Sequence, residues 1–379
     1  MAANSSSPVK RTAALFLGHM LNDGFASFFA PLLPLLIEKL HLSLILAGSL
    51  GTLRIATNSL LQPGLGALVD RSERPWLVVI GPMLTVTAMS FIGRVSSSVL
   101  LLIIMILAGI GTAMFHPAAA SLVATGTAGR RGLLMAFFSS GGTLGGAVAP
   151  VFIVSFVDKL SLAGTPFLLI PGILTLAAFA ILLKRALPSS VRKKKDVIVT
   201  RIPPRLFPLW FAIVLSSACS IGFSNFLAVL IVDRGGSPLA GGGAISLFLL
   251  AGAAGGFFAG NLSDRFGRKP IIFGSLVIAA PFYLAFLHAP LSFALPLIGL
   301  AGIFSLSSVP VGVVAAQESM PGRTGLVSGL VMGLAWGLGG FALTPIGWLA
   351  DRFGLAAVMN GVSLLPLIAA VLVLAWRTD

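Results

Sequence analysis

Long apolar runs, separated by short gaps that hold most of the charged residues, make up nearly all of this 379-residue chain. A helix needs about 20 mostly apolar residues to cross the hydrocarbon core of a bilayer, which is about 30 Å thick. The pattern therefore predicts an all-α membrane protein with twelve transmembrane helices. They are expected at residues 12–37, 43–69, 76–93, 98–125, 132–157, 165–187, 206–232, 239–263, 270–288, 291–317, 324–350 and 355–376.

The composition agrees with this class. Apolar residues make up 57% of the chain and charged residues 9%, whereas soluble domains contain about 45–50% and about 25%. The 44 glycines and 23 prolines are typical of closely packed and kinked membrane helices. The single cysteine, Cys219, lies in an apolar run, so no internal disulfide is expected.

The formal net charge of +14 could by itself indicate a nucleic-acid partner. Lys and Arg instead gather in alternate gaps, as expected for the cytoplasmic loops of a multi-pass protein. The densest group lies between residues 184 and 205, a segment that also contains Pro188, Pro203 and Pro204. We therefore expect a lipid bilayer rather than nucleic acid as the partner, with both chain termini in the cytoplasm.

One loop motif, G-x-x-x-D-R-x-G-R-K, occurs twice, and its copies begin 194 positions apart. The complete copy is made by Gly260, Asp264, Arg265, Gly267, Arg268 and Lys269. The other copy keeps Gly66, Asp70, Arg71 and Arg74. A shorter copy follows at residues 347–354, and Pro117 and Pro310 repeat at nearly the same offset.

Such self-similarity indicates two parallel repeats. The predicted organisation is an N-terminal six-helix bundle at residues 1–187, a basic linker at 188–205 and a C-terminal six-helix bundle at 206–379. The two bundles are expected to be pseudo-symmetric. Repeats of this kind are typical of proteins that move solutes by rocking one half against the other.

With twelve spans, a basic linker and the repeated loop, the chain resembles the major facilitator superfamily over its whole length. Residues 18–23 (Gly-His-Met-Leu-Asn-Asp) and 109–117 (Gly-Ile-Gly-Thr-Ala-Met-Phe-His-Pro) resemble the fosmidomycin-resistance type of exporter. This resemblance implies alternating access, a small-molecule substrate, no cofactor, and a monomer in a bacterial inner membrane. Many antiporters of the superfamily carry an arginine where this chain has Met105, so a mechanism built on that arginine does not carry over.

Asp23 and Arg54 are charged residues inside predicted spans, where a charge costs about 2.5–3.5 kcal/mol. Each lies eleven residues from the predicted end of its span, or about 16 Å at 1.5 Å per residue, which is near the midplane. Because the two spans are consecutive, the side chains are expected to face each other. Low dielectric favours a neutral carboxyl group and a nearby guanidinium favours the carboxylate, so the pair could couple transport to protons. A fixed structural ion pair is the alternative.

Two histidines, His19 and His116, also lie within predicted spans. Histidine titrates near neutral pH, so either could relay protons or contact an anionic substrate. A hydrogen-bonded packing residue is the alternative for both.

Polar and aromatic residues of several spans are candidates for the wall of a substrate cavity, because aromatic walls with a few polar groups suit amphipathic solutes. The candidates are Asn22, Phe25, Asn58, Gln62, Phe115, Phe138, Ser220, Ser224, Ser308 and Trp336. Packing between helices explains the same residues. The loop motif is interpreted as a conformational element whose contacts form and break as the cytoplasmic side closes and opens.

No Walker loop, catalytic triad or Cys/His spacing for a metal is recognisable, so neither an enzyme nor a metal site is predicted. The sequence favours a proton-coupled antiporter that exports a small drug-like or anionic compound. A uniporter or importer of a sugar or organic acid is the alternative within transport. A non-transporting membrane receptor or scaffold is the alternative of another class.

Overall fold

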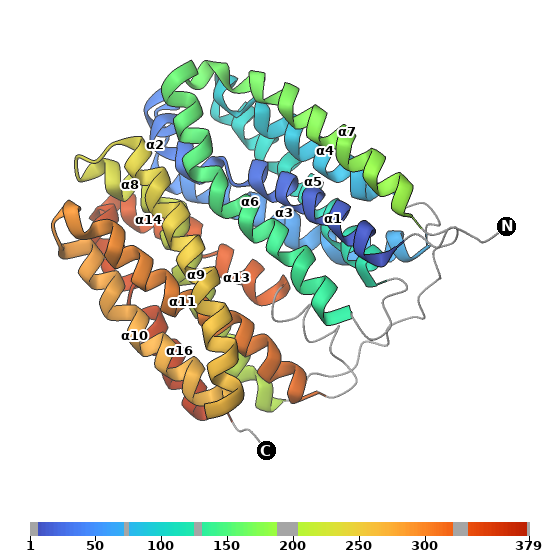
Figure 1. The fold of residues 1–379 in the computed structure, drawn as a ribbon. Helices are drawn as coiled ribbons and strands as arrows, with labels where there is room; N and C mark the ends of the chain where they lie inside the picture. Colours follow the sequence, from blue (N-terminus) through green and yellow to red (C-terminus); the bar gives the residue numbers. More distant parts are fainter. Residues whose placement is uncertain (1–6, 72–75, 125–130, 188–203, 321–332, 377–379) are drawn as a thin grey trace. The chain divides into compact units, whose positions relative to one another are not determined.

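The computed structural model describes residues 7–71, 76–124, 131–187, 204–320 and 333–376. Every regular element in these ranges is a helix. Twelve helical segments in the same ranges are long and apolar enough to cross a membrane, from Pro8–Leu40 to Leu355–Ala375. The predicted all-α fold class with twelve transmembrane helices is thus confirmed (Figure 1).

Contacts divide the chain into two compact units, the first made by Met1–Phe29 and Thr57–Asp196. Its helices are α1 (Pro8–Ala26), the second part of α3 (Leu44–Arg71), α4 (Leu77–Ser90), α5 (Ser98–Ala124), α6 (Arg131–Leu160) and α7 (Leu169–Ala186). Helix α1 packs against α4, α5, α6 and α7. It is therefore the central helix of this unit, and its side chains are surrounded by other helices.

The second unit is made by Ala30–Ala56 and Val197–Asp379. It contains α2 (Phe29–Leu40) from its second residue, the first part of α3, α8 (Phe207–Asp233), α9 (Pro238–Phe266), α10 (Arg268–His288), α11 (Ala294–Glu318), α13 (Trp336–Gly340), α14 (Leu343–Phe353), α15 (Leu355–Val362) and α16 (Leu365–Ala375). Helix α8 packs against α9, α11, α13 and α16, which gives it a central place like that of α1.

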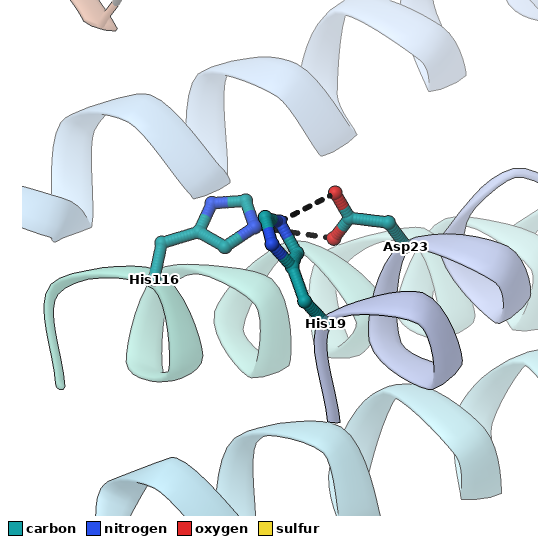
Figure 2. A group of neighbouring side chains, drawn as sticks. All are labelled: His19, Asp23 and His116. Carbon is teal, nitrogen blue, oxygen red and sulfur yellow. Dashed lines mark hydrogen bonds and ion pairs between the residues drawn. The ribbon is translucent and has the colours of Figure 1, made fainter. Parts of the chain in front are cut away.

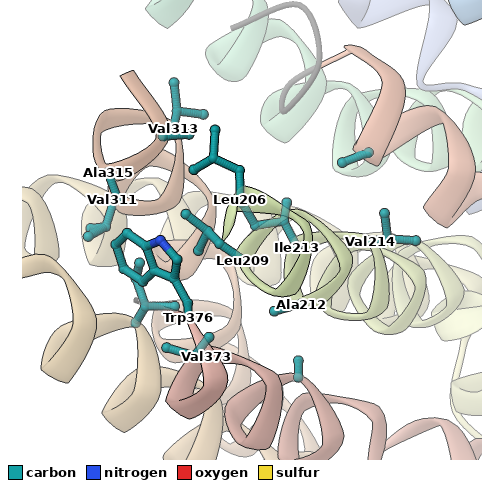
Figure 3. Close-up of a cluster of buried hydrophobic side chains, with 14 of the residues drawn as sticks. Leu206, Leu209, Ala212, Ile213, Val214, Val311, Val313, Ala315, Val373 and Trp376 are labelled. Atoms are coloured by element: carbon teal, nitrogen blue, oxygen red, sulfur yellow. The ribbon is translucent and has the colours of Figure 1, made fainter. Parts of the chain in front are cut away.

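An apolar cluster fills the end of the second unit near the N-terminus of α8 (Figure 3). Leu209 and Ile213 of α8 pack there with Val311 of α11, Val373 of α16 and Trp376, all nearly without exposed surface. Between helices in a bilayer such packing stabilises the fold through van der Waals contact, because lipid tails are as apolar as these side chains. The cluster therefore holds α8, α11 and α16 together.

The predicted division at residues 187 and 206 stays a prediction. The boundaries between the two compact units fall at Phe29/Ala30 and Ala56/Thr57, within the first two spans, and at Asp196/Val197, within the predicted linker. The first span is broken at Ser27 and Phe28, between α1 and α2. Pro31 explains the break, because it lacks the N–H that would bond the carbonyl of Ser27 four residues earlier.

Candidate functional site

Asp23, near the C-terminal end of α1, forms the centre of a polar cluster inside the first unit (Figure 2). Its Oδ2 lies 3.1 Å from Nε2 of His19, one turn earlier on the same helix. Its Oδ1 lies 3.1 Å from Nε2 of His116, which α5 contributes. Residues 93 positions apart in the chain thus meet because α1 packs against α5.

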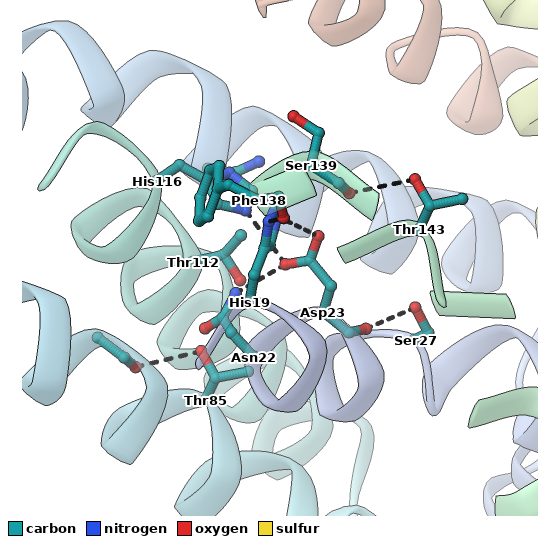
Figure 4. A network of polar contacts seen from close by, with 12 residues as sticks. His19, Asn22, Asp23, Ser27, Thr85, Thr112, His116, Phe138, Ser139 and Thr143 are labelled. Carbon is teal, nitrogen blue, oxygen red and sulfur yellow. Dashed lines mark hydrogen bonds and ion pairs between the residues drawn. The ribbon is translucent and has the colours of Figure 1, made fainter. Parts of the chain in front are cut away.

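Hydrogen bonds to neighbouring groups fix the orientation of this cluster (Figure 4). The His19 Nδ1 donates to the backbone carbonyl of Phe138 on α6, at 2.9 Å. The Asn22 amide donates to Asp23 Oδ1 at 2.9 Å, and the Ser27 hydroxyl donates to the Asp23 carbonyl at 2.7 Å. The Asp23 carboxylate, the His19 ring and the C-terminal end of α1 thus each have a further hydrogen bond that fixes their position.

Aromatic rings enclose the His19 side of the cluster. The Phe138 ring stacks on the imidazole at 4.3 Å between centroids, with an interplanar angle of 23°. Phe115 lies at 5.6 Å from the same ring. Side-chain exposure is 10% for His19, 26% for Asp23 and 28% for His116, so His19 is the most buried member and the other two keep an accessible side.

Gly142 of α6 lies directly against the cluster. A Cβ atom there would lie 2.6 Å from His19 Cδ2 and 2.7 Å from Asp23 Oδ2, both well below ordinary van der Waals contact. The absence of a side chain at this position is what allows α6 to approach the two titratable groups.

The geometry also constrains the protons. A carbonyl oxygen can only accept, so the Nδ1 of His19 carries a hydrogen. Its Nε2 then faces Oδ2 of Asp23 at 3.1 Å, and this contact is favourable only if one proton lies between them, on the imidazole or on the carboxyl group. The cluster can therefore hold a proton shared by two residues.

Of the four residues predicted for proton coupling, the structure brings Asp23, His19 and His116 together. Arg54 belongs to the second unit, so its predicted pairing with Asp23 stays a prediction. The spacing of His19 and Asp23, one helical turn apart, was a sequence signal for their contact. Nothing in the sequence gave the contact with His116.

The predicted cavity residues fall into separate groups. Asn22, Phe115 and Phe138 surround the cluster, whereas the Phe25 ring packs on Phe28 and lies near Gly172 of α7. Asn58 accepts a hydrogen bond from Gln62 at 2.9 Å, one turn along α3.

In the second unit, Ser220 and Ser308 of the predicted cavity are almost fully buried. Ser220 lies 2.8 Å from the hydroxyl of Ser305, and Ser308 lies 3.2 Å from that of Ser216. These contacts join α8 to α11. Ser224 of α8 and Trp336 at the start of α13 are partly exposed, and a role of all four in a cavity stays a prediction.

The complete loop motif joins α9 to α10. Gly267 has φ +91° between the two helices, a conformation that favours glycine. Arg268 contacts Asp264 at 2.5 Å and Glu318 of α11 at 2.8 Å, and Lys269 donates to the carbonyls of Leu374 and Trp376 at the end of α16. The motif thus connects α9, α10, α11 and α16.

The remaining motif residues have fewer described features. Gly260, Asp264 and Arg265 lie in the last two turns of α9, and the Arg265 side chain is exposed. Gly66, Asp70 and Arg71 belong to the end of α3. The side chains of Asp70 and Arg71 lie outside the described part of the structure, as does the whole of Arg74.

Comparisons with known proteins agree with this architecture. A sequence model of the Major Facilitator Superfamily matches residues 15–344. The Fosmidomycin resistance protein of Escherichia coli (strain K12) is 28% identical over 365 residues, which cover 94% of this chain and 90% of that protein. The uncharacterized MFS-type transporter YfnC of Bacillus subtilis (strain 168) is 28% identical over 364 residues, covering 92% of this chain and 88% of its own length.

Solved structures show the same fold. A bacterial homolog of the human lysosomal transporter Spinster, in an inward-facing and unoccupied conformation, has a TM-score of 0.82 at 18% identity, covering 98% of this chain and 97% of its own. A mutant of the nucleoside transporter NupG has a TM-score of 0.74 at 14% identity, and the match covers 97% of this chain and 99% of that one. At these identities the likeness is one of fold.

Proposed function

Because the chain belongs to the Major Facilitator Superfamily and is thus a multi-pass membrane transporter, we propose that it is a proton-coupled antiporter. It exports a small drug-like or anionic compound by alternating access. It acts as a monomer in a bacterial inner membrane, with both termini in the cytoplasm. The observation that carries the proposal is the contact of one carboxylate with two imidazoles inside the transmembrane part of the first unit.

This cluster has the chemistry that proton coupling needs. One proton between His19 and Asp23 makes their 3.1 Å contact favourable, and loss of that proton places a lone pair of Nε2 against the carboxylate. Release of the proton therefore favours separation of the two side chains, and uptake favours their contact. Because His19 also donates to the Phe138 carbonyl of α6, a proton-dependent shift of its ring links titration to the packing of α1 against α6.

The direction of transport and the substrate class rest on the relative in Escherichia coli. That protein is called a resistance protein for fosmidomycin, and resistance conferred by a membrane transporter is most simply export. The residues of this chain at 18–23 and 109–117, which carry the resemblance, include all three members of the cluster.

The complete loop motif supports alternating access in a second way. Arg268 links α9 to α11 through partly exposed carboxylates, and exposed ion pairs contribute only about 0–1 kcal/mol each. Such contacts can form and break during a transport cycle without a large barrier. We assign the motif a conformational role on this basis.

The test uses purified protein in liposomes that enclose a pH-sensitive dye. Fosmidomycin, added on one side under a proton gradient, is expected to cross as protons cross in the opposite direction. Asp23→Asn, which keeps the shape of the side chain, is expected to lose substrate transport driven by the gradient. His288→Gln serves as a matched control, because His288 pairs with Asn360 in the second unit.

Transport of the solute without any proton movement would refute the coupling and favour the uniporter. Proton movement in the same direction as the solute would favour an importer. Full gradient-driven transport by Asp23→Asn would remove the carboxylate from the mechanism.

A further inference from the structure

We propose that the cluster of His19, Asp23 and His116 also binds a divalent transition-metal ion, with Zn²⁺ as the best match, in competition with the proton. The ligand atoms of the three residues all lie within 4.8 Å of one another. Metal binding does not depend on the proposed transport function. If the cluster carries the transported protons, the bound ion should also inhibit transport, and this second expectation rests on the proposed transport function.

The donor set fits zinc. Two imidazole nitrogens and one carboxylate oxygen are ligands that Zn²⁺ takes, and three protein ligands with one open position are typical of accessible zinc sites. Imidazole ligands favour Zn²⁺ and its transition-metal neighbours over Mg²⁺ and Ca²⁺, which prefer oxygen. The site is therefore not expected to bind either of those two ions.

The distances fit as well. Ligand atoms about 2.0–2.1 Å from a tetrahedral zinc are about 3.3 Å apart. The two Nε2 atoms lie 3.1 Å from different oxygens of Asp23, Oδ2 for His19 and Oδ1 for His116. One ring and one oxygen are thus already at nearly the required spacing, and rotation of the more exposed His116 brings the third ligand atom to the same ion.

The surrounding hydrogen bonds are those of a prepared metal site. A histidine that binds zinc usually donates its other ring N–H to a carbonyl or carboxylate. His19 does so through Nδ1 to the Phe138 carbonyl, which leaves Nε2 directed at the cluster. The Asn22 amide holds Asp23 Oδ1 in the same way. Both ligand orientations are thus fixed before any ion arrives.

The net charge of the cluster and its exposed side also suit a metal ion. Two neutral imidazoles and one carboxylate carry a charge of −1, so Zn²⁺ gives the cluster the same net charge as two added protons do. The ion therefore substitutes electrostatically for two protons on the cluster. The exposed sides of Asp23 and His116 admit the ion and leave room for a water molecule as fourth ligand.

The test is equilibrium binding to the purified full-length protein in detergent. Zn²⁺ is titrated by calorimetry, and Co²⁺ is used as a probe because its visible absorption reports tetrahedral coordination. We expect one saturable site per chain, release of protons on binding, and at least tenfold weaker binding at pH 5.5 than at pH 7.5, because the ligands must be deprotonated.

Asp23→Asn and His116→Gln are each expected to weaken binding by at least tenfold, because loss of even a residue that only orients a metal ligand costs about 10–100-fold. His288→Gln makes the same substitution at a histidine of the second unit that pairs with Asn360, and this variant is expected to bind as the wild type does. Size-exclusion profiles identify any variant that fails to fold, and His116→Gln alters the most exposed of the three side chains. The absence of a saturable site, or equal weakening by the control, would overturn the proposal.

The two proposals fail separately. Zinc binding by a protein that moves no protons would leave the metal site standing and remove the antiport. Proton-coupled transport that Zn²⁺ neither binds nor inhibits would leave the antiport standing and remove the metal site.

Discussion

Gly142→Ala is the smallest change that should disable the candidate site, because it removes no titratable group. The added Cβ would lie 2.6 Å from His19 Cδ2 and 2.7 Å from Asp23 Oδ2, whereas ordinary contact begins at 3.4 Å. The shortfalls of 0.8 and 0.7 Å force both side chains away from α6. Their 3.1 Å contact then lengthens beyond the 3.5 Å limit of a useful hydrogen bond.

The cost follows from the interaction that is lost. A hydrogen bond to a charged group contributes about 1.5–3 kcal/mol, which is roughly a ten- to hundredfold change in the population of the closed, proton-loaded cluster. Overpacking a well-packed interior costs a further 1–3 kcal/mol or so. The better helix propensity of alanine offsets up to about 1 kcal/mol of that loss. We therefore expect a folded protein with a small loss of stability and a large loss of proton coupling.

Gly146→Ala is the matched control, one turn further along α6. Its Cβ would meet only Ser27 Oγ, at 3.5 Å, which is an ordinary contact. Proton movement in liposomes and thermal denaturation in detergent are measured for both variants. Wild-type proton coupling in folded Gly142→Ala, or an equal loss in Gly146→Ala, would refute the assignment of the cluster.

Two further predictions concern the second unit. Asp351→Ala removes a carboxylate that accepts hydrogen bonds from the backbone N–H groups of Leu44 at 2.7 Å and Ile45 at 2.8 Å, at the start of α3. Loss of such a cap should lower stability by about 0.5–2 kcal/mol, and Asp351→Asn should lower it less. Equal melting temperatures of the two variants would contradict the capping role. Ser220→Ala removes the partner of the buried Ser305 hydroxyl and should lower stability in thermal denaturation by about 1 kcal/mol. Ser224→Ala, at a partly exposed position, should change stability by less than about 0.5 kcal/mol. The reverse order would show that the hydroxyl pair does not hold α8 to α11.

The fold followed from the sequence because membrane spans are set by length and apolar content alone. The break in the first span was missed, although Pro31 supplied the signal. Pro31 leaves the carbonyl of Ser27 without its helical partner, so α1 ends at Ala26 and α2 begins at Phe29. The apolar pattern runs through the proline, and for this reason the sequence predicted one continuous helix.

The sequence suggested the members of the candidate site but not their geometry. Asp23, His19 and His116 were each identified because ionisable residues are rare inside membrane spans. The approach of His116 to the other two depends on how α1 lies against α5, which no spacing in one chain specifies. The sequence therefore favoured Arg54 as the partner of Asp23, since consecutive spans are the only neighbours that chain order guarantees.

Besides the ring contacts, the main chains of helices α1 and α6 approach each other closely. A Cβ at Gly141 would lie 2.5 Å from the Phe16 carbonyl, and one at Gly145 would lie 2.9 Å from Cα of Met20. Larger residues at either position would push the helices apart, so this seam fixes the height of α1 along α6 by backbone contact. The placement of His19 and Asp23 beside α6 therefore depends on two positions that carry no side chain.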